Sequence, residues 1–160
     1  MIKYTKEEAK HIWVTSDTHF NHANIIKYCN RPFSSVEEMN ETIIANWNKV
    51  VSEGDIVYHL GDFALGDKSL IPDFIKRLTG HINFIMGNHD NLNIMKNFET
   101  PFRCETVSWE EVIRVEKKTI ILNHFPFGSL PDPATNRPII QLHGHVHSTP
   151  DKPWNYFDNQ

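Results

Sequence analysis

The sequence of 160 residues has only two cysteines, no long apolar run and no excess of positive charge. Cys29 and Cys104 lie far apart and form no CxxC pair, which argues against a disulfide framework and against a thiolate metal site. No apolar stretch approaches the ~18 residues of a membrane span, and residues 1–10 are charged where a signal peptide is apolar. We therefore expect a cytoplasmic protein with no membrane partner.

The balance of charge bears on nucleic acid as a partner. Sixteen lysines and arginines stand against twenty acidic residues, which gives a formal net charge of -4. Non-specific binding of nucleic acid requires a basic face, so this composition disfavours such a partner while leaving it open. Hydrophobic residues make up 39% and charged residues 22%, which is typical of a globular protein, and the length suits a single domain over 1–160. The sequence does not determine the oligomeric state.

Short apolar runs alternate with amphipathic segments along most of the chain. We expect strands at 11–16, 55–60 and 81–86. We expect helices at 34–51, 70–78 and 92–98. Four further strands are expected at 104–109, 112–116, 119–123 and 138–143. The early alternation predicts a parallel sheet with crossover helices, and the later strands predict a second, more antiparallel sheet, so the class is an α/β sandwich.

Histidine is the residue that this sequence has in excess, with ten copies. Half of them fall in small polar clusters that follow directly after expected strands. These clusters are Asp17-Thr18-His19, Gly61-Asp62, Gly87-Asn88-His89-Asp90, His124 and Gly144-His145-Val146-His147. Ligands of open α/β sheets bind beyond the carboxyl ends of the strands, so we expect the five clusters to converge. Three clusters begin with glycine, which lets the backbone turn sharply and approach a ligand closely.

Each cluster taken alone also has an ordinary structural explanation. Asp62 after a glycine is often part of an Asx-turn or a helix cap, and Asn88 or Asp90 can cap a following helix. A lone histidine at a strand end, such as His124, is usually a hydrogen-bonded structural residue. Five such coincidences, all at strand ends and all with nitrogen or oxygen donors, are better explained by one shared site.

The donors of these clusters indicate a metal site without thiolate. They are Asp17, His19, Asp62, Asn88, His124, His145 and His147. Carboxylate, imidazole and amide donors suit Mn²⁺, Fe²⁺, Zn²⁺, Co²⁺, Ni²⁺ or Mg²⁺. Seven donors are too many for one tetrahedral ion and about right for two ions that share a bridging carboxylate. Such a pair of ions lowers the pKa of a water held between them and promotes in-line displacement at phosphorus.

In order along the chain, the five clusters resemble the motifs of the calcineurin-like metallophosphoesterase superfamily, which read D-x-H, G-D, G-N-H-[D/E], a lone H and G-H-x-H. The match extends from about Ile12 to His147, and the residues around the first motif resemble the small, cap-less bacterial and phage-type branch. The resemblance implies a four-layer αββα sandwich of two mixed β-sheets flanked by helices.

The resemblance also implies a role for each motif residue. One metal ion would be held by Asp17, His19, Asp62 and His147. The other would be held by Asp62, Asn88, His124 and His145, with Asp62 as the bridge. His89 would be catalytic, stabilising the phosphoryl group and protonating the leaving oxygen, and Asp90 would orient its ring. Hydroxide between the two divalent ions would be the nucleophile. Mn²⁺ is the first choice for these ions, and Fe²⁺, Zn²⁺, Ni²⁺, Co²⁺ or Mg²⁺ are the alternatives.

Three further residues are candidates for substrate binding. His22 follows His19 by three residues and either lines the pocket or caps a helix. Arg31 and Arg137 can match phosphate oxygens bidentately, although each is equally typical of an exposed arginine beside a proline. The remaining histidines, which we expect to be structural, are His11, His59, His81 and His143.

One loop departs from the resemblance. Related small members often carry a basic or polar residue soon after the fourth-motif histidine, whereas here His124 is followed by Phe125-Pro126-Phe127-Gly128.

We therefore expect a phosphoesterase that depends on two divalent metal ions and hydrolyses a small phosphomonoester, phosphodiester or nucleotide. Two alternatives stay open. The first is a metal-dependent nuclease, which the net charge of -4 and the lack of a basic, aromatic-interleaved stripe disfavour. The second is a non-catalytic metal-binding interaction module of the same fold, which is disfavoured because no motif residue is missing.

Overall fold

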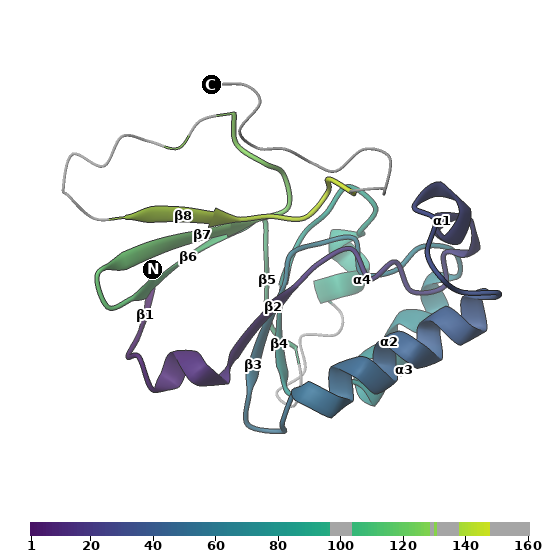
Figure 1. Cartoon of the computed structure of the whole chain (residues 1–160), viewed down its shortest axis with the longest axis horizontal. Coiled ribbons are helices and arrows are strands. Elements are labelled where there is room, and N and C mark those ends of the chain that lie inside the picture. Colours follow the sequence, from purple (N-terminus) through teal and green to yellow (C-terminus); the bar gives the residue numbers. More distant parts are fainter. Residues whose placement is uncertain (97–103, 129, 131–137, 148–160) are drawn as a thin grey trace.

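The computed structural model describes residues 1–96, 104–128, 130 and 138–147, which form two four-stranded sheets. One sheet has the strand order β2 (Ile12–Thr15), β3 (Ile56–His59), β4 (His81–Ile85) and β5 (Cys104–Ser108). The other has the order β1 (Ile2–Tyr4), β6 (Glu110–Val115), β7 (Lys118–Asn123) and β8 (Ile139–Leu142). Figure 1 shows the two sheets next to each other, with the α-helices on the side of the first sheet.

The first sheet is parallel throughout, so the carboxyl ends of its strands lie at one edge. Its longer connections contain α1 (Ala23–Tyr28) and α2 (Val36–Val50) before β3, and α3 (Ile71–Arg77) before β4. α4 (Leu92–Lys96) follows β4, and two 3₁₀ turns lie at Glu8–His11 and Lys68–Leu70. As its sequence predicts, α2 begins after a capping serine, since the Ser35 side chain accepts a hydrogen bond from Glu38 N at 3.1 Å.

The second sheet is mixed. β1 is parallel to β6, β6 is antiparallel to β7, and β7 is parallel to β8. Because β7 and β8 run in the same direction, the residues that follow them emerge side by side. Gly144 N donates a hydrogen bond to His124 O at 3.1 Å, so two of the polar clusters are joined at this point.

Two apolar clusters hold the layers together. The first lies between the β2–β5 sheet and the helices and includes Trp47, Phe74, Phe84 and Met95. The second lies between the two sheets and consists of the buried residues Tyr58, Leu60, Ile85, Ile113 and Leu122. Burying such side chains contributes about 1.5–3 kcal/mol each, which fixes the sheets relative to each other and therefore the loops at their ends.

The predicted α/β class, with two packed sheets and helices, is confirmed. Segment 104–109, however, was expected in the second sheet, and β5 instead pairs in parallel with β4. The reason is that it follows α4 and therefore completes another strand–helix–strand unit of the first sheet. The first sheet is consequently parallel rather than mixed.

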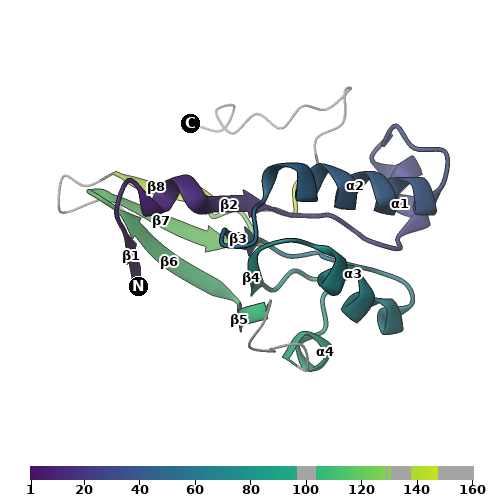
Figure 2. The same ribbon diagram turned by 90° about the horizontal axis from the view of Figure 1, so that it is seen from below.

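The helices are distributed unevenly over the two sheets. α2, α3 and α4 contribute to the apolar cluster on the outer face of the β2–β5 sheet, and Figure 2 shows α2 and α3 on the side away from β6 and β7. Within the described residues, no α-helix covers the outer face of the second sheet, so these residues form three of the four expected layers.

The described part of the chain has no helix long and apolar enough to cross a membrane, and its longest helix has 15 residues. The cellular compartment stays a prediction.

Candidate metal centre

The loops after β2 and β3 continue side by side beyond the end of the sheet. Asp17 N donates to Gly61 O at 2.9 Å, and His19 N donates to Asp62 O at 3.0 Å. Asp17, His19 and Asp62 have positive φ angles of 54°, 52° and 56°. Residues other than glycine adopt this conformation at a cost of about 1–3 kcal/mol each, and surrounding structure must hold them there. Such strain on neighbouring polar residues is typical of a functional site.

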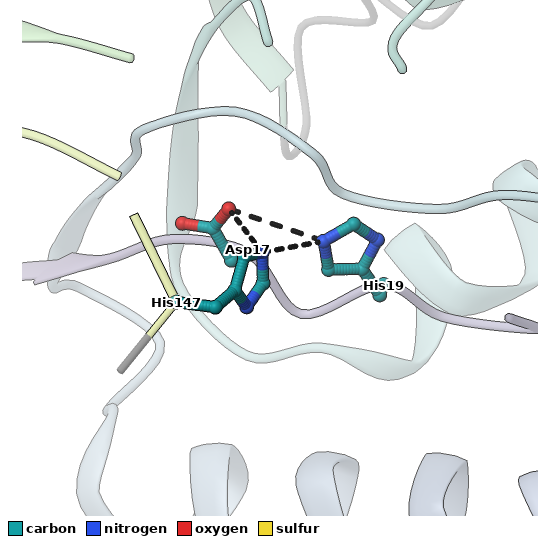
Figure 3. Close-up of side chains that lie close together, drawn as sticks. All are labelled: Asp17, His19 and His147. Carbon is teal, nitrogen blue, oxygen red and sulfur yellow. Dashed lines mark hydrogen bonds and ion pairs between the residues drawn. The ribbon is translucent and has the colours of Figure 1, made fainter. Parts of the chain in front are cut away.

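The first cluster of donors consists of Asp17, His19 and His147 (Figure 3). His19 Nε2 lies 3.2 Å from His147 Nε2. Asp17 Oδ1 lies 3.3 Å from His147 Nε2 and 3.9 Å from His19 Nε2. Figure 3 shows the three side chains directed toward one another, although they come from loops of different sheets.

A second cluster consists of Asn88, His124 and His145, and Asp62 lies between the two clusters. Asn88 Oδ1 is 3.1 Å from His124 Nε2 and 2.9 Å from His145 Nδ1. The Asp62 side chain is buried, and its Oδ2 is 3.7 Å from His19 Nε2 and 3.5 Å from His124 Nε2. One carboxylate oxygen therefore lies at similar distances from both clusters.

The protonation states of the first cluster suit metal binding. Burial, together with positive charge on His147 and Arg31, lowers the pKa of His19 to about 3, so its ring is neutral near pH 7. Burial alone would raise the pKa of Asp17, but hydrogen bonds from His147 and Ser16 outweigh it and lower that pKa to about 2. A neutral imidazole and an ionised carboxylate are the forms that coordinate metal ions.

The donor set fits divalent metal ions. Besides the first cluster, the donor atoms of Asp17, Asp62 and His124 also lie within 4.8 Å of one another. His19 Nε2 and His147 Nε2 are close enough that no more than one proton fits between them, and a cation there can be bound by both nitrogens. Nitrogen and oxygen donors without thiolate suit borderline to hard divalent ions.

Two glycines let the loops approach this closely. Gly61 has a φ of +95°, and a Cβ there would lie 2.6 Å from both Gly87 N and His124 Nδ1. A Cβ at Gly144 would collide with the Asp17 carboxylate and lie 2.9 Å from Ser16 Cβ. Contacts under 3.0 Å require a shift of backbone or donor, so larger residues would separate the loops that meet at the site.

Hydrogen bonds behind the donors set their orientation. His124 Nδ1 lies 2.7 Å from Leu60 O, which places the proton on Nδ1 and leaves the Nε2 lone pair facing Asp62 and Asn88. On the other side, the backbone N–H of His145 donates to both Asp17 carboxylate oxygens at 3.1 Å. The loop after β8 is thereby tied to the loop after β2.

His89 lies at the open side of the centre. Its side chain is 42% exposed, and its Nε2 is 3.9 Å from Asp62 Oδ2. Its backbone N–H donates to Asp62 Oδ1 at 3.0 Å, so the residue is fixed at its base. The ring is therefore accessible to a substrate that reaches Asp62, and its catalytic role stays a prediction.

Asp90 does not make the expected contact with the His89 ring. Its carboxylate instead accepts hydrogen bonds from the backbone N–H groups of Asp62, Phe63 and Gly87, at 2.8, 3.0 and 2.9 Å. Burial raises the pKa of Asp90, although these three hydrogen bonds oppose the shift. The expectation that Asp90 orients His89 is wrong, because the loop after β3 brings three N–H donors within reach of this carboxylate.

The candidate substrate-binding residues have different positions. The His22 ring centroid lies 5.2 Å from that of His19 and 6.4 Å from that of His89, and the side chain makes no cap hydrogen bond. Its role in the substrate pocket stays a prediction. The Arg31 guanidinium donates to Asp17 O at 2.6 Å and Thr18 O at 2.9 Å, which holds the loop after β2. A contact of Arg31 with phosphate stays a prediction, and Arg137 lies outside the described residues.

Two supporting residues were not singled out from the sequence. Thr18 Oγ1 donates to Phe63 O at 2.8 Å and lies 3.0 Å from Nε2 of the fully buried His59, whose pKa is lowered by burial to about 3. Gln141 Nε2 donates to Phe125 O at 2.9 Å, and Gln141 Oε1 accepts from Phe127 N at 2.9 Å. No sequence signal marks Gln141, because these contacts depend on the parallel pairing of β7 with β8.

The two sheets and the donor clusters at their ends define a metallophosphoesterase domain. The chain belongs to the calcineurin-like phosphoesterase family, whose pattern matches residues 10–156. Members of this family bind divalent metal ions and hydrolyse phosphate esters.

Several similar proteins are known. The uncharacterized protein MJ1445 of Methanocaldococcus jannaschii is 59% identical over 139 residues, which cover 86% of this chain and 69% of that protein. The gene 66 protein of Mycobacterium phage L5 is 30% identical over 160 residues, covering 85% of this chain and 77% of that protein. Among solved structures, the protein of unknown function AQ665 from Aquifex aeolicus has a TM-score of 0.65 at 28% identity, covering 91% and 81% of the two chains.

Proposed function

We propose that the chain is a phosphoesterase that uses two divalent metal ions, with Mn²⁺ as the first choice, to hydrolyse a small phosphomonoester, phosphodiester or nucleotide. One observation carries the proposal. Asp62 Oδ2 lies 3.7 Å from a ring nitrogen of the first cluster and 3.5 Å from a ring nitrogen of the second. A buried carboxylate between two sets of nitrogen and oxygen donors is what a pair of ions with a shared ligand requires.

The residues that would hold each ion follow from this arrangement. Asp17, His19 and His147 would hold one ion, Asn88, His124 and His145 would hold the other, and Asp62 would contact both. When bound, such ions supply positive charge to the phosphate oxygens and lower the pKa of water. The charge of two divalent ions more than offsets the carboxylates of Asp17 and Asp62, so an acidic chain would present a cationic cleft to phosphate.

His89 is proposed to act on the leaving group. Its ring is 42% exposed beside Asp62, while its backbone N–H is bound to the same carboxylate. A histidine in this position can donate a hydrogen bond to a phosphoryl oxygen and protonate the leaving oxygen. The neighbouring His22 ring borders the same side of the site, where it is proposed to contact the leaving group.

Turnover of bis(p-nitrophenyl) phosphate in Mn²⁺ tests this proposal. We expect the wild-type chain to release p-nitrophenolate and a chelator to stop the reaction until Mn²⁺ is restored. Asp62→Asn keeps an acceptor for the His89 N–H but removes the bridging charge, and should lower kcat/KM by about 1,000-fold or more, equivalent to about 4 kcal/mol. The unfolding midpoint of this variant in chelator should match that of the wild type. Retained activity in Asp62→Asn would contradict the proposal. A wild type that hydrolyses neither this diester nor p-nitrophenyl phosphate with any of the six ions would contradict it too.

The same assay separates small esters from nucleic acid. We expect faster hydrolysis of small aryl phosphomonoesters or phosphodiesters than of single-stranded DNA or RNA at equal Mn²⁺. Faster cleavage of either nucleic acid would identify a nuclease and overturn the small-substrate part of the proposal.

A further inference from the structure

An exposed aromatic ring stands directly beside the second cluster. Phe125 is 44% exposed, although it follows the fully buried side chain of His124. Its ring centroid lies 4.9 Å from that of His124, with the planes at 81°, and 4.8 Å from that of His145, with the planes at 61°. Phe125 therefore contacts two expected metal ligands and still presents part of its ring to solvent.

The backbone that carries this ring is fixed. Gln141 of β8 donates from Nε2 to Phe125 O at 2.9 Å and to Asn123 Oδ1 at 2.5 Å, and accepts from Phe127 N at 2.9 Å. One side chain thus binds three points of the segment 123–127. A ring on a fixed backbone loses little conformational freedom when a ligand stacks on it.

The chemistry of the loop points to an apolar, planar group as the ligand. Residues 124–128 contain no lysine, arginine or acidic residue. Aromatic side chains stack on nucleobases of any sequence, because every base has a π-face. An exposed phenylalanine beside a phosphate site can therefore bind the aromatic substituent of a phosphate ester, while the phosphate itself is bound at the metal centre.

The positions of the His89 and Phe125 rings indicate which part of the substrate carries the aromatic substituent, namely the part that stays attached to phosphate. His89, proposed to protonate the leaving oxygen, lies beside the rings of His19 and His22. Phe125 lies beside the rings of the second cluster. In an in-line displacement, the leaving group departs on one side of phosphorus, so a group bound near the second cluster stays attached to phosphate.

We propose that Phe125 is a specificity-determining residue that stacks on the nucleobase of a nucleoside phosphodiester. The proposal rests on the phosphoesterase function proposed above. It predicts a preference for phosphodiesters in which the retained substituent is a nucleoside rather than an alkyl group.

Two esters with the same leaving group test this preference. The p-nitrophenyl ester of thymidine 5′-phosphate and ethyl p-nitrophenyl phosphate both release p-nitrophenolate and differ only in the retained substituent. We expect the wild type to have a higher kcat/KM for the thymidine ester, mainly through a lower KM. In Phe125→Leu, which keeps an apolar side chain and loses the π-face, the ratio of kcat/KM between the two esters should fall about fivefold or more. Phe125→Tyr keeps the ring and should retain the wild-type ratio.

The outcomes separate this inference from the proposed function. If Phe125 only packs against His145, Phe125→Leu will slow both esters equally, and an equal change, including complete loss of both activities, would overturn the stacking role. A wild type that hydrolyses both esters with equal kcat/KM would overturn it too, while leaving the phosphoesterase function in place. A wild type that hydrolyses neither ester, and no p-nitrophenyl phosphate either, in any of the divalent ions would contradict the proposed function itself.

Discussion

The two donor clusters differ in how firmly the fold holds them. In the first cluster, the side chains of His19, Asp17 and His147 are 2%, 13% and 26% exposed. The His22 ring contacts Nδ1 of His19, on the opposite side of the ring from Nε2. In the second cluster only His124 is buried, whereas His145 and Asn88 are exposed. One half of the centre is therefore enclosed by the fold, whereas the other half is open to solvent.

The backbone contributes to the same contrast. Arg31 donates to consecutive carbonyls of the loop that carries Asp17 and His19, and Thr18 of this loop contacts the buried His59. In the second cluster, His124 is held by Leu60 O and the His145 backbone N–H by the Asp17 carboxylate. Among the described residues, however, no such contact orients the exposed side chain of His145 from behind, and the exposed Phe125 ring lies beside it. We therefore expect the first cluster to bind its ion more tightly.

Removing one histidine from each cluster should have the largest effect. We expect His147→Ala to weaken Mn²⁺ binding strongly, because it removes a metal ligand from an enclosed cluster. Loss of a residue that only hydrogen-bonds a metal ligand costs roughly 10–100-fold in metal affinity, and loss of the ligand itself should cost more. The matched variant His145→Ala should cost less, since water can take the place of an exposed ligand. Titration of Mn²⁺ into each metal-free variant measures both affinities, and an equal or reversed order would contradict tighter binding by the first cluster.

The contact behind His19 gives the next test. His22 Nδ1 lies 3.2 Å from His19 Nδ1, so His22→Ala removes the group that orients the ring. We expect one of the two Mn²⁺ affinities to fall by about 10–100-fold while the other stays unchanged. His22→Gln, which keeps a hydrogen-bonding group, should recover part of the loss. An effect of His22→Ala on both affinities, or on neither, would show that His22 does not act through the first cluster.

Arg31 tests the support of the loop after β2. Arg31→Lys keeps the positive charge but loses the planar guanidinium that donates to both Asp17 O and Thr18 O. We expect this variant to lower the free energy of unfolding by about 2 kcal/mol. Arg77→Lys is the matched control, because Arg77 and Glu41 form an exposed pair and the change should stay within about 0.5 kcal/mol. Urea unfolding in chelator measures both variants, and similar values for the two would contradict the supporting role of Arg31.

The smallest expected effect is on the pH dependence of stability. Burial lowers the pKa of His59 from 6.5 to about 3, so between these pH values the unfolded chain binds a proton that the folded chain does not. Stability from this group is complete above pH 6.5 and is lost as pH falls toward 3, at up to about 1.4 kcal/mol per pH unit. Asp17 adds almost no slope above pH 5.5, because its pKa is lowered from 3.8 to about 2 and its contribution is lost only as pH falls through 3.8 toward 2.

His59→Leu isolates that contribution. Between pH 6.5 and pH 5.5, the free energy of unfolding in chelator should fall by about 1 kcal/mol less in the variant than in the wild type. His19 has a lowered pKa in both chains, so its contribution cancels in the difference. Identical slopes for the two chains would contradict a neutral, buried His59.

Much of the site could be predicted because it follows from the topology. Parallel strands end at one edge, so Asp17, Asp62 and Asn88 were expected to meet, and the structure places them in one centre. The meeting of His124 with the loop after β8 follows from the parallel pairing of β7 and β8. The sequence was least informative where several partners compete for one group.

Asp90 and β5 illustrate that limit. The family resemblance implied that the Asp90 carboxylate orients the His89 ring, but backbone N–H groups of another loop bind it instead. Similarly, the apolar pattern of 104–109 predicted a strand but not the sheet to which it belongs, because either sheet could bury such a segment. Both outcomes depend on contacts between segments far apart in the sequence.

The most direct test of the centre is the electron paramagnetic resonance spectrum of Mn²⁺ titrated into metal-free chain. We expect the wild type to bind two ions per chain and to give an exchange-coupled spectrum, because Asp62 contacts both clusters. Asp62→Asn should give an uncoupled spectrum or a single bound ion. Two uncoupled ions in the wild type, or one ion at saturation, would contradict the proposal that Asp62 joins the two clusters into one centre.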